Sequence, residues 1–288
     1  MNHSAVSQNA HRPSAIPDLE LQMIRDGRLA WDRDPAFTGL LAKKRVAVVG
    51  PARTLIGASR GKWIDSHDLV VRFNDAFEYF RDSKPLSADI GSRTDVLYCN
   101  QVIIRKNILE GGFARRRFTD FVRKAKLKCV VCTNNSLSYA PNGDPATRCE
   151  VKDRDVLKNF AGFLAAEVPE TRFRVVTTAS TLLIKWLNGN WGRTGFIALV
   201  DVLGFMPEHV NVTGMTFYHG GGHLSTNGPE LHPLGNRDGT SSISPGGLGH
   251  DSVLELDILR RLVASNEALI GVDEALRSLI GPAENKST

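Results

Sequence analysis

Residues 45–74, RVAVVGPARTLIGASRGKWIDSHDLVVRFN, indicate how this chain folds. An apolar run over residues 46–49 ends at Gly50, and a second run over residues 69–73 ends at Asn74. Continuous apolar runs are typical of strands in a parallel sheet that is covered on both faces. The turn after the first run lacks the G-x-G-x-x-G pattern of dinucleotide sites and the G-K-S/T ending of a P-loop. We therefore predict a nucleotide-type fold that binds neither NAD nor ATP.

The same pattern continues along the chain. Further apolar, β-branched runs are separated by helical stretches, so we expect a single Rossmann-like α/β/α sandwich with a mostly parallel central sheet. The site of such a fold lies at the carboxyl ends of the strands. The expected strands are 95–99, 128–133, 173–177 and 210–215, and the expected helices are 155–168, 194–206, 251–263 and 272–280.

The length of 288 residues suits one large α/β domain, and no linker or internal repeat divides the sequence. We expect residues 1–36 to form a partly disordered N-terminal extension and residues 37–288 to form a single domain. Residues 219–249 are rich in Gly, Pro, Ser and Asn and have no periodicity. Loops of this length are usually lids or binding loops, so we predict a flexible lid there.

The formal net charge of +5 favours anionic partners. Much of this charge lies in residues 114–128, ARRRFTDFVRKAKLK, which we expect to be helical. Two interpretations stay open: a solvated basic face, or a surface for peripheral contact with anionic lipid or an acidic glycan. No nucleic-acid motif accompanies the charge, so no nucleic-acid partner is expected. Without a signal-like or membrane-spanning apolar run, the expected location is the cytoplasm, including the inner face of the membrane.

The cysteine pattern suits a reducing compartment. Cys129 and Cys132 form a C-x-x-C inside an expected strand, whereas Cys99 and Cys149 stand apart. Residues three apart on a strand point to opposite faces, so we predict that Cys129 and Cys132 are core residues. A redox or zinc role is the alternative.

No metal site is expected. The acidic triplets at 32–34 and 153–155 do not follow apolar strands, as they would if they bound a metal–diphosphate complex. The second triplet suits the start of a helix, where acids complement the helix dipole. His219 and His223 have the spacing of helical metal ligands, but the three glycines between them do not favour a helix.

Three separated stretches resemble the motifs of the eukaryotic-type sialyltransferase family. Residues 192–218 resemble its short motif, with Thr194, Gly195 and Gly214 in the equivalent places, and His250 with Glu255 matches its H-x4-E motif. His232 lies eighteen residues before His250, about where the family has another histidine. The opening stretch resembles the family's long motif, which this chain matches with Arg45, Gly50, Gly61, residues 64–68 (IDSHD), Arg72, Asn74, Ala76, Asp89 and residues 91–94 (GSRT).

The resemblance implies a GT-A-like variant of the sandwich and a glycosyltransferase activity. The implied enzyme moves a nonulosonic acid, with sialic acid as first choice, from its CMP conjugate to a hydroxyl of an oligosaccharide or glycolipid. It inverts the anomeric centre and needs neither metal nor cofactor. CMP-Kdo is the alternative donor, and a catalytically silent nucleotide- or glycan-binding homologue is the alternative function. Val46 and Met206 or Pro207 replace the cysteines of the family disulfide, which indicates a bacterial-type member.

The resemblance also implies roles for individual residues. His250 would be the catalytic base, because a position just before a helix favours the neutral imidazole. His232 would contact the phosphate of the donor. Supporting roles fall to Glu255, Asp65 and His67, the last by hydrogen bonds in the loop before the second strand. The expected donor-binding residues are Gly50, Arg53, Thr54, Asn74, Thr194, Gly195 and Gly214.

Overall fold

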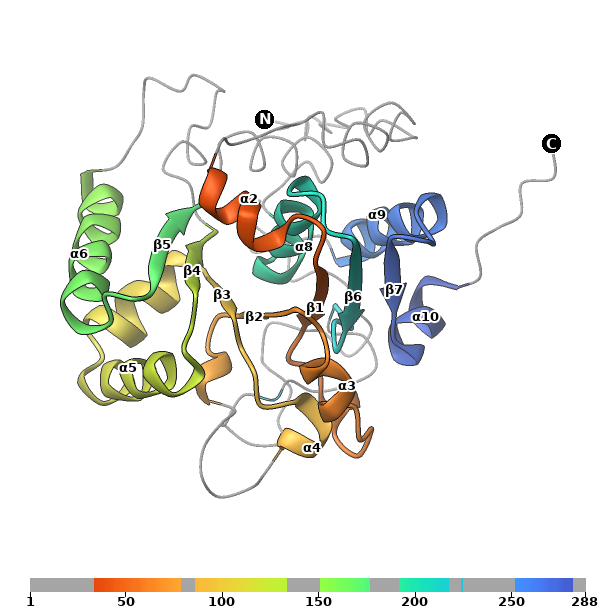
Figure 1. The fold of residues 1–288 in the computed structure, drawn as a ribbon, viewed down its shortest axis with the longest axis horizontal. Coiled ribbons are helices and arrows are strands. Elements are labelled where there is room, and N and C mark those ends of the chain that lie inside the picture. The colour runs from red at the N-terminus through yellow and green to blue at the C-terminus, as the bar shows by residue number, and fades with distance from the viewer. Residues whose placement is uncertain are drawn as a thin grey trace, which may run out of the picture.

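The computed structural model describes residues 34–78, 86–133, 151–176, 192–217, 224 and 252–281. Seven strands form one sheet in the order β5-β4-β3-β2-β1-β6-β7, and every neighbouring pair is parallel (Figure 1). The predicted parallel sheet is therefore confirmed. The strands are β1 (Arg45–Val49), β2 (Leu69–Phe73), β3 (Val96–Cys99), β4 (Cys129–Cys132), β5 (Arg172–Val175), β6 (His209–Thr213) and β7 (Ile270–Val272).

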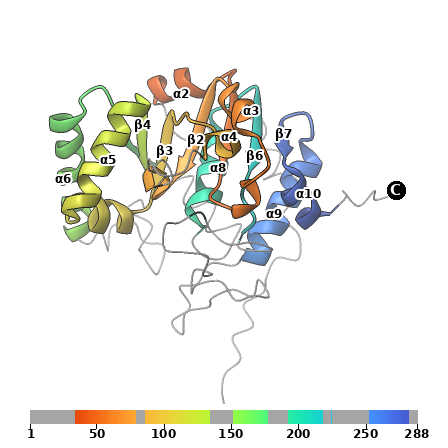
Figure 2. The same cartoon turned by 90° about the horizontal axis from the view of Figure 1, so that it is seen from below.

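Helices cover both faces of the sheet, which confirms the α/β/α sandwich. The first face packs against α2 (Pro35–Leu41), α8 (Thr194–Gly204), α9 (Ser252–Ser265) and α10 (Glu274–Ile280). The second face packs against α3 (Gly61–Asp65), α4 (Ser87–Ile90), α5 (Gly112–Ala125), α6 (Val151–Glu167), the 3-10 turns η1 (Arg53–Leu55) and η2 (Ala76–Glu78), and the π-helix η3 (Ile103–Leu109). Seen from below, α5 and α6 stay at the β4 end of the sheet and α9 and α10 at the β7 end (Figure 2).

The strands are apolar on both sides because both sides are buried. In β1, Val46 and Val48 face the first helical layer, whereas Ala47 and Val49 face the second. The same alternation separates Cys129 from Cys132, which belong to the two opposite core clusters, and this confirms the prediction. Burial raises the pKa of the Cys129 thiol to about 12. This thiol therefore stays protonated and packs as a small apolar group.

β7 was not predicted from the sequence, and the helix expected from residue 272 begins instead at Glu274. The strand has three residues, of which the middle one is Gly271, so it leaves no clear apolar run. A Cβ at position 271 would lie 2.3 Å from Asn211 Oδ1 on the neighbouring strand. Close packing between β6 and β7 thus requires a glycine where a strand-forming residue would otherwise stand.

Several predictions lie outside the described residues. They concern the extension over residues 1–36, apart from its last three residues, and the lid over residues 219–249, of which only Leu224 is described. No helix among the described ranges is both long enough and apolar enough to cross a bilayer.

Candidate functional site

The strand order of the sheet marks one edge as the candidate site. β1 lies between β2 on one side and β6 on the other, so the connections reverse direction there. In open parallel sheets, ligands bind beyond the carboxyl ends of the strands at such a reversal. The residues that follow these ends are Gly50 after β1, Asn74 after β2 and Gly214 after β6. The structure thus brings three of the predicted donor-binding residues to one edge.

Gly50 and Gly214 pack directly against each other. The Gly50 N–H donates to the carbonyl of Thr213 at 2.8 Å, and the Ala52 N–H donates to the carbonyl of Gly214 at 3.0 Å. A Cβ on Gly50 would lie 2.2 Å from the Gly214 oxygen, and Gly214 has a φ of +66°. Both positions therefore require glycine, because the turns after β1 and β6 meet backbone to backbone.

Asn74 lies beside these turns in the left-handed region, with a φ of +48°. Its Oδ1 accepts the N–H of Asn100 at 3.0 Å, which joins the ends of β2 and β3. Asn100 in turn accepts the Ile103 N–H with its own side chain and so caps η3. Among the described residues, none accepts a hydrogen bond from Asn74 Nδ2. This amide group is therefore a donor that remains for a ligand.

Thr54 and Arg53 lie in η1, directly after the β1 turn. Thr54 Oγ1 is buried, and among the described residues only this atom and Arg117 Nε are buried side-chain polar atoms without a hydrogen-bond partner. A buried hydroxyl without a partner is unfavourable, which makes it a candidate contact for a polar ligand. Arg53 is exposed. The Leu224 N–H donates to the carbonyl of Pro51 at 2.7 Å, so this residue of the predicted lid touches the same turn.

The start of α8 lies over the same edge. A Cβ on Gly195 would lie 3.1 Å from Met215, which follows the β6 turn, and 3.3 Å from the ring of Phe73 at the end of β2. Thr194 is the first residue of α8. The side chain of Arg193, at the N-cap position, makes no capping hydrogen bond to the helix. The backbone N–H groups and the positive end of the dipole at this helix start favour an anion.

Glu255 in the first turn of α9 binds the residue that precedes α8. Its Oε1 accepts the Arg193 N–H at 2.7 Å, and its Oε2 lies 3.1 Å from Arg193 Nη1. The carboxylate is fully buried, so both interactions are shielded from water. α9 begins two residues after His250, and this ion pair holds its first turn beside the start of α8. His250 and His232 themselves lie outside the described residues.

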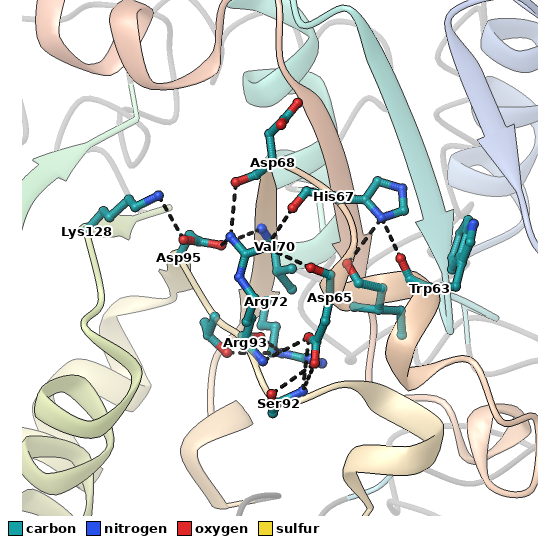
Figure 3. Close-up of polar contacts among 12 residues, drawn as sticks. Trp63, Asp65, His67, Asp68, Val70, Arg72, Ser92, Arg93, Asp95 and Lys128 are labelled. Atoms are coloured by element: carbon teal, nitrogen blue, oxygen red, sulfur yellow. Dashed lines mark hydrogen bonds and ion pairs between the residues drawn. The ribbon is translucent and has the colours of Figure 1, made fainter.

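The IDSHD and GSRT segments of the long motif lie at the opposite edge of the sheet, before the amino ends of β2 and β3 (Figure 3). Asp65 accepts hydrogen bonds from the backbone N–H groups of Ser92 and Arg93 at 2.8–3.0 Å. The Arg93 guanidinium donates in return to the carbonyls of Asp65 and His67 at 2.8 and 2.7 Å. The IDSHD and GSRT segments of the motif therefore bind each other, and they set the path of the chain into both strands.

Arg72 extends this network into the core. Its side chain is buried and donates to the carbonyl of Arg93, the hydroxyl of Thr94 and the carbonyl of Ile90. A buried guanidinium is tolerated when its N–H groups meet acceptors in this way. Nearby, Asp95 accepts the Val70 N–H at 2.9 Å and pairs with Arg93 and Lys128 (Figure 3).

His67 links this edge to β6. Its Nδ1 lies 3.0 Å from the Trp63 carbonyl and 3.1 Å from the Ile64 carbonyl, and its Nε2 lies 2.8 Å from Asn211 Nδ2. A neutral ring with its proton on Nδ1 satisfies all three contacts. Burial lowers the pKa of His67, which favours this neutral form. The partner in β6 was not predicted, because nothing in the sequence pairs it with His67.

A buried polar cluster missed by the sequence analysis holds α8 against the sheet. Asp201 of α8 accepts the Tyr98 hydroxyl at 2.7 Å and pairs with Arg174 Nη1 at 2.5 Å. The Arg174 guanidinium also lies 4.3 Å from the centre of the Phe37 ring. Burial raises the pKa of Tyr98 well above its usual value, and the Asp201 charge raises it further. This cluster ties α8, β3 and β5 together and so positions the helix start over the site.

The matches found by sequence include the part of the chain that carries the long motif. The model of glycosyltransferase family 29 (sialyltransferase) matches residues 37–139. Sialyltransferase-like protein 2 of Oryza sativa subsp. indica is 36% identical over 70 residues, which are 24% of this chain and 16% of that protein. This chain thus matches less than a fifth of that relative's length.

Solved structures of sialyltransferases are similar over most of the chain at low identity. A mammalian sialyltransferase in complex with Gal-beta-1-3GalNAc-ortho-nitrophenol is 15% identical with a TM-score of 0.48, covering 88% of this chain and 79% of that one. The monofunctional alpha-2,3-sialyltransferase Cst-I of Campylobacter jejuni is 14% identical with a TM-score of 0.49, covering 85% and 83%. The match to the family model by itself confirms the resemblance to the sialyltransferases of glycosyltransferase family 29 over residues 37–139.

Proposed function

We propose that this chain is an inverting, metal-independent glycosyltransferase that moves a nonulosonic acid from its CMP conjugate to a glycan hydroxyl. Sialic acid is the first choice of donor sugar. The observation that supports this most is the meeting of Gly50, Asn74 and Gly214 with the start of α8 at the reversal of the strand order. Two of these residues lie within the region that matches the family model.

Donor recognition in this proposal uses two groups for which the described residues supply no hydrogen-bond partner. The Asn74 amide and the buried Thr54 hydroxyl would bind the ribose or the phosphate of CMP. The start of α8 would face the phosphate with its N–H groups and its dipole. CMP carries one phosphate, so N–H groups, hydroxyls and one cation suffice to neutralise the leaving group.

The reaction breaks the bond between the anomeric carbon and the phosphate oxygen and forms one to the acceptor oxygen. His250 would take the proton of the acceptor hydroxyl while that oxygen attacks, and CMP would leave with the electron pair of the broken bond. His232 would steady the departing phosphate. The ion pair between Glu255 and Arg193 supports this placement, because it holds the chain just after His250 beside α8.

The acceptor in this proposal is an oligosaccharide or a glycolipid. A cytoplasmic enzyme at the inner face of the membrane would meet such acceptors during the synthesis of lipid-linked glycans. Nucleic acid has no part in the reaction.

Release of CMP from a panel of CMP-sugars tests the proposal. We expect turnover of CMP-sialic acid that EDTA does not change. Turnover of CMP-Kdo alone would establish the rival donor, and CMP binding without turnover of any donor would establish a silent homologue. A strict requirement for a divalent metal would contradict the proposed mechanism.

A further inference from the structure

We propose that η3 and the first turns of α5 form a docking surface for anionic lipid membranes. The two helices pack against each other and are joined by Glu110 and Gly111. Each has a buried side toward the core and an exposed side toward solvent. We define the η3–α5 surface by five exposed residues, Val102, Arg105, Lys106, Phe113 and Arg116. Glu110, Gly112 and Arg115 are also exposed in this part of the chain.

The η3–α5 surface shares only Arg116 with residues 114–128, the basic segment that stands out in the sequence. Several Lys and Arg side chains of residues 114–128 form ion pairs or a cation–π contact with neighbouring residues. These side chains therefore contribute less positive charge to an exposed basic surface. The engaged pairs are Arg117 with Glu78 at 2.7 Å, Arg123 with Glu167 at 3.3 Å, Lys128 with Asp95 at 2.9 Å, and Arg115 at 4.6 Å from the centre of the Phe163 ring.

The η3–α5 surface exposes large apolar side chains. Phe113 is 65% exposed and Val102 is 54% exposed, although Arg117 lies 4.4 Å from the centre of the Phe113 ring. The core of the same helices is supplied by other residues, among them Ile104 and Ile108. The exposed side chains are therefore not needed to fill the core, and they would lose unfavourable contact with water on entering an apolar phase.

Cations surround these apolar side chains. No ion pair involves Arg105, Lys106 or Arg116 within the described part of the chain. Between residues 102 and 120 the sequence has five basic residues against two acidic ones, Glu110 and Asp120. Exposed aromatic and aliphatic side chains flanked by Lys and Arg are typical of segments that lie in the interface of an anionic bilayer.

The combination favours a lipid surface over an acidic polymer. A polyanion would use the cations but would leave Phe113 and Val102 in water. An anionic bilayer can bind the cations and the apolar side chains together. Its headgroups pair with Lys and Arg, and the apolar side chains insert at the boundary between headgroups and acyl chains.

The surface also adjoins the candidate site, because Asn100 binds Asn74 on one side and caps η3 on the other. Docking would therefore bring the carboxyl edge of the sheet close to a membrane. The conclusion that the acceptor is a glycolipid rests on the proposed function, whereas the membrane contact does not.

Flotation of the full chain with vesicles tests the contact without any activity readout. The vesicles contain phosphatidylcholine alone or with phosphatidylglycerol, and they carry no acceptor glycan. We expect binding to the anionic vesicles only, weakening as salt rises. Arg105→Gln with Lys106→Gln should lower the apparent affinity about 10-fold or more. Val102→Ser with Phe113→Ser should lower it about 10-fold as well.

Matched control variants distinguish binding through this surface from an effect of net charge or of exposed apolar area elsewhere on the protein. Lys43→Gln with Lys44→Gln removes the same charge from exposed positions before β1, and Met206→Ser removes an apolar side chain that is 55% exposed. Both controls should keep vesicle binding, and every variant should keep the wild-type melting temperature. The proposal is overturned if the wild type binds no vesicles or if the controls weaken binding as much. It is also overturned if heparin binding depends on Arg105 and Lys106 while vesicle binding does not.

Discussion

Glu255 and Arg193 join the first turn of α9 to the residue before α8, through a hydrogen bond of 2.7 Å and an ion pair of 3.1 Å. The carboxylate is fully buried and the Arg193 side chain is 14% exposed. The pair holds the start of α9 beside the start of α8, and His250, the base of the proposed function, stands two residues before α9 in the chain.

Glu255→Ala should therefore destabilise the protein. The substitution removes the buried carboxylate that pairs with the largely buried Arg193 guanidinium, and we expect a loss of about 3 kcal/mol in the free energy of unfolding. Glu255→Gln should lose less, because its amide oxygen still accepts the Arg193 N–H. Urea unfolding measures both, with the exposed Glu274→Ala as control. Equal stability of Glu255→Ala and the control would show that the pair contributes nothing.

Gly50→Ala should also destabilise the protein, because its Cβ would lie 2.2 Å from the Gly214 carbonyl oxygen. Two backbone segments must then separate, and we expect a loss of at least about 2 kcal/mol. Gly39→Ala is the matched control, since no atom lies within 4 Å of its Cβ and it lies in α2. This control should be neutral or stabilising by about 0.5–1 kcal/mol. Thermal and urea unfolding distinguish the two, and similar values would contradict the close approach.

The stability of the protein should fall in acid partly because of His67. Burial lowers its pKa below the ordinary value of 6.5, and the nearby charges of Arg45 and His209 lower it further. Below about pH 6.5 the His67 imidazole binds a proton more readily in the unfolded chain than in the folded chain. The free energy of unfolding therefore decreases as the pH falls. In His67→Gln this part of the pH dependence should disappear. Urea unfolding at pH 7.5, 6 and 5 measures it, and parallel curves for both proteins would contradict the assignment.

Asn74→Gly tests donor binding while it preserves the left-handed backbone at φ +48°. Loss of the amide donor should lower the affinity for CMP about 10-fold, as expected for one hydrogen bond of about 1.4 kcal/mol, and loss of the oxygen that accepts the Asn100 N–H adds to this effect. Isothermal titration with CMP measures this. His67→Gln, at the opposite edge of the sheet, should leave the affinity unchanged. Equal loss in both variants would show that the effect is not local to the carboxyl edge.

His250→Ala should abolish sugar transfer and spare CMP binding, because the proposed base acts on the acceptor and not on the nucleotide. We expect a fall in kcat of about 100-fold or more. Steady-state release of CMP and titration with CMP separate the two effects. Turnover equal to that of the wild type would remove His250 from the mechanism.

Local patterns in the sequence were sufficient for six of the seven strands, whereas β7 leaves no clear apolar run. Residues 46–49 of β1 and 69–71 of β2 are all apolar because each strand is buried on both faces, and that requirement acts on consecutive residues. The same reasoning placed Cys129 and Cys132 on opposite faces. The long motif was sufficient for the family resemblance, since its residues are close together in the chain.

Only the tertiary structure decided which polar residues meet. Asp65 binds Ser92 and Arg93 across 27 and 28 positions, and His67 meets Asn211 across 144 positions. No sequence period relates such pairs, because the packing of loops and strands brings them together. The ion pairs that engage much of the 114–128 segment also depend on helices and turns far away in the chain. The sequence therefore determined most strands of the sheet and the turns at its carboxyl edge, whereas the packing decided which polar groups hold the fold together and which remain for a ligand.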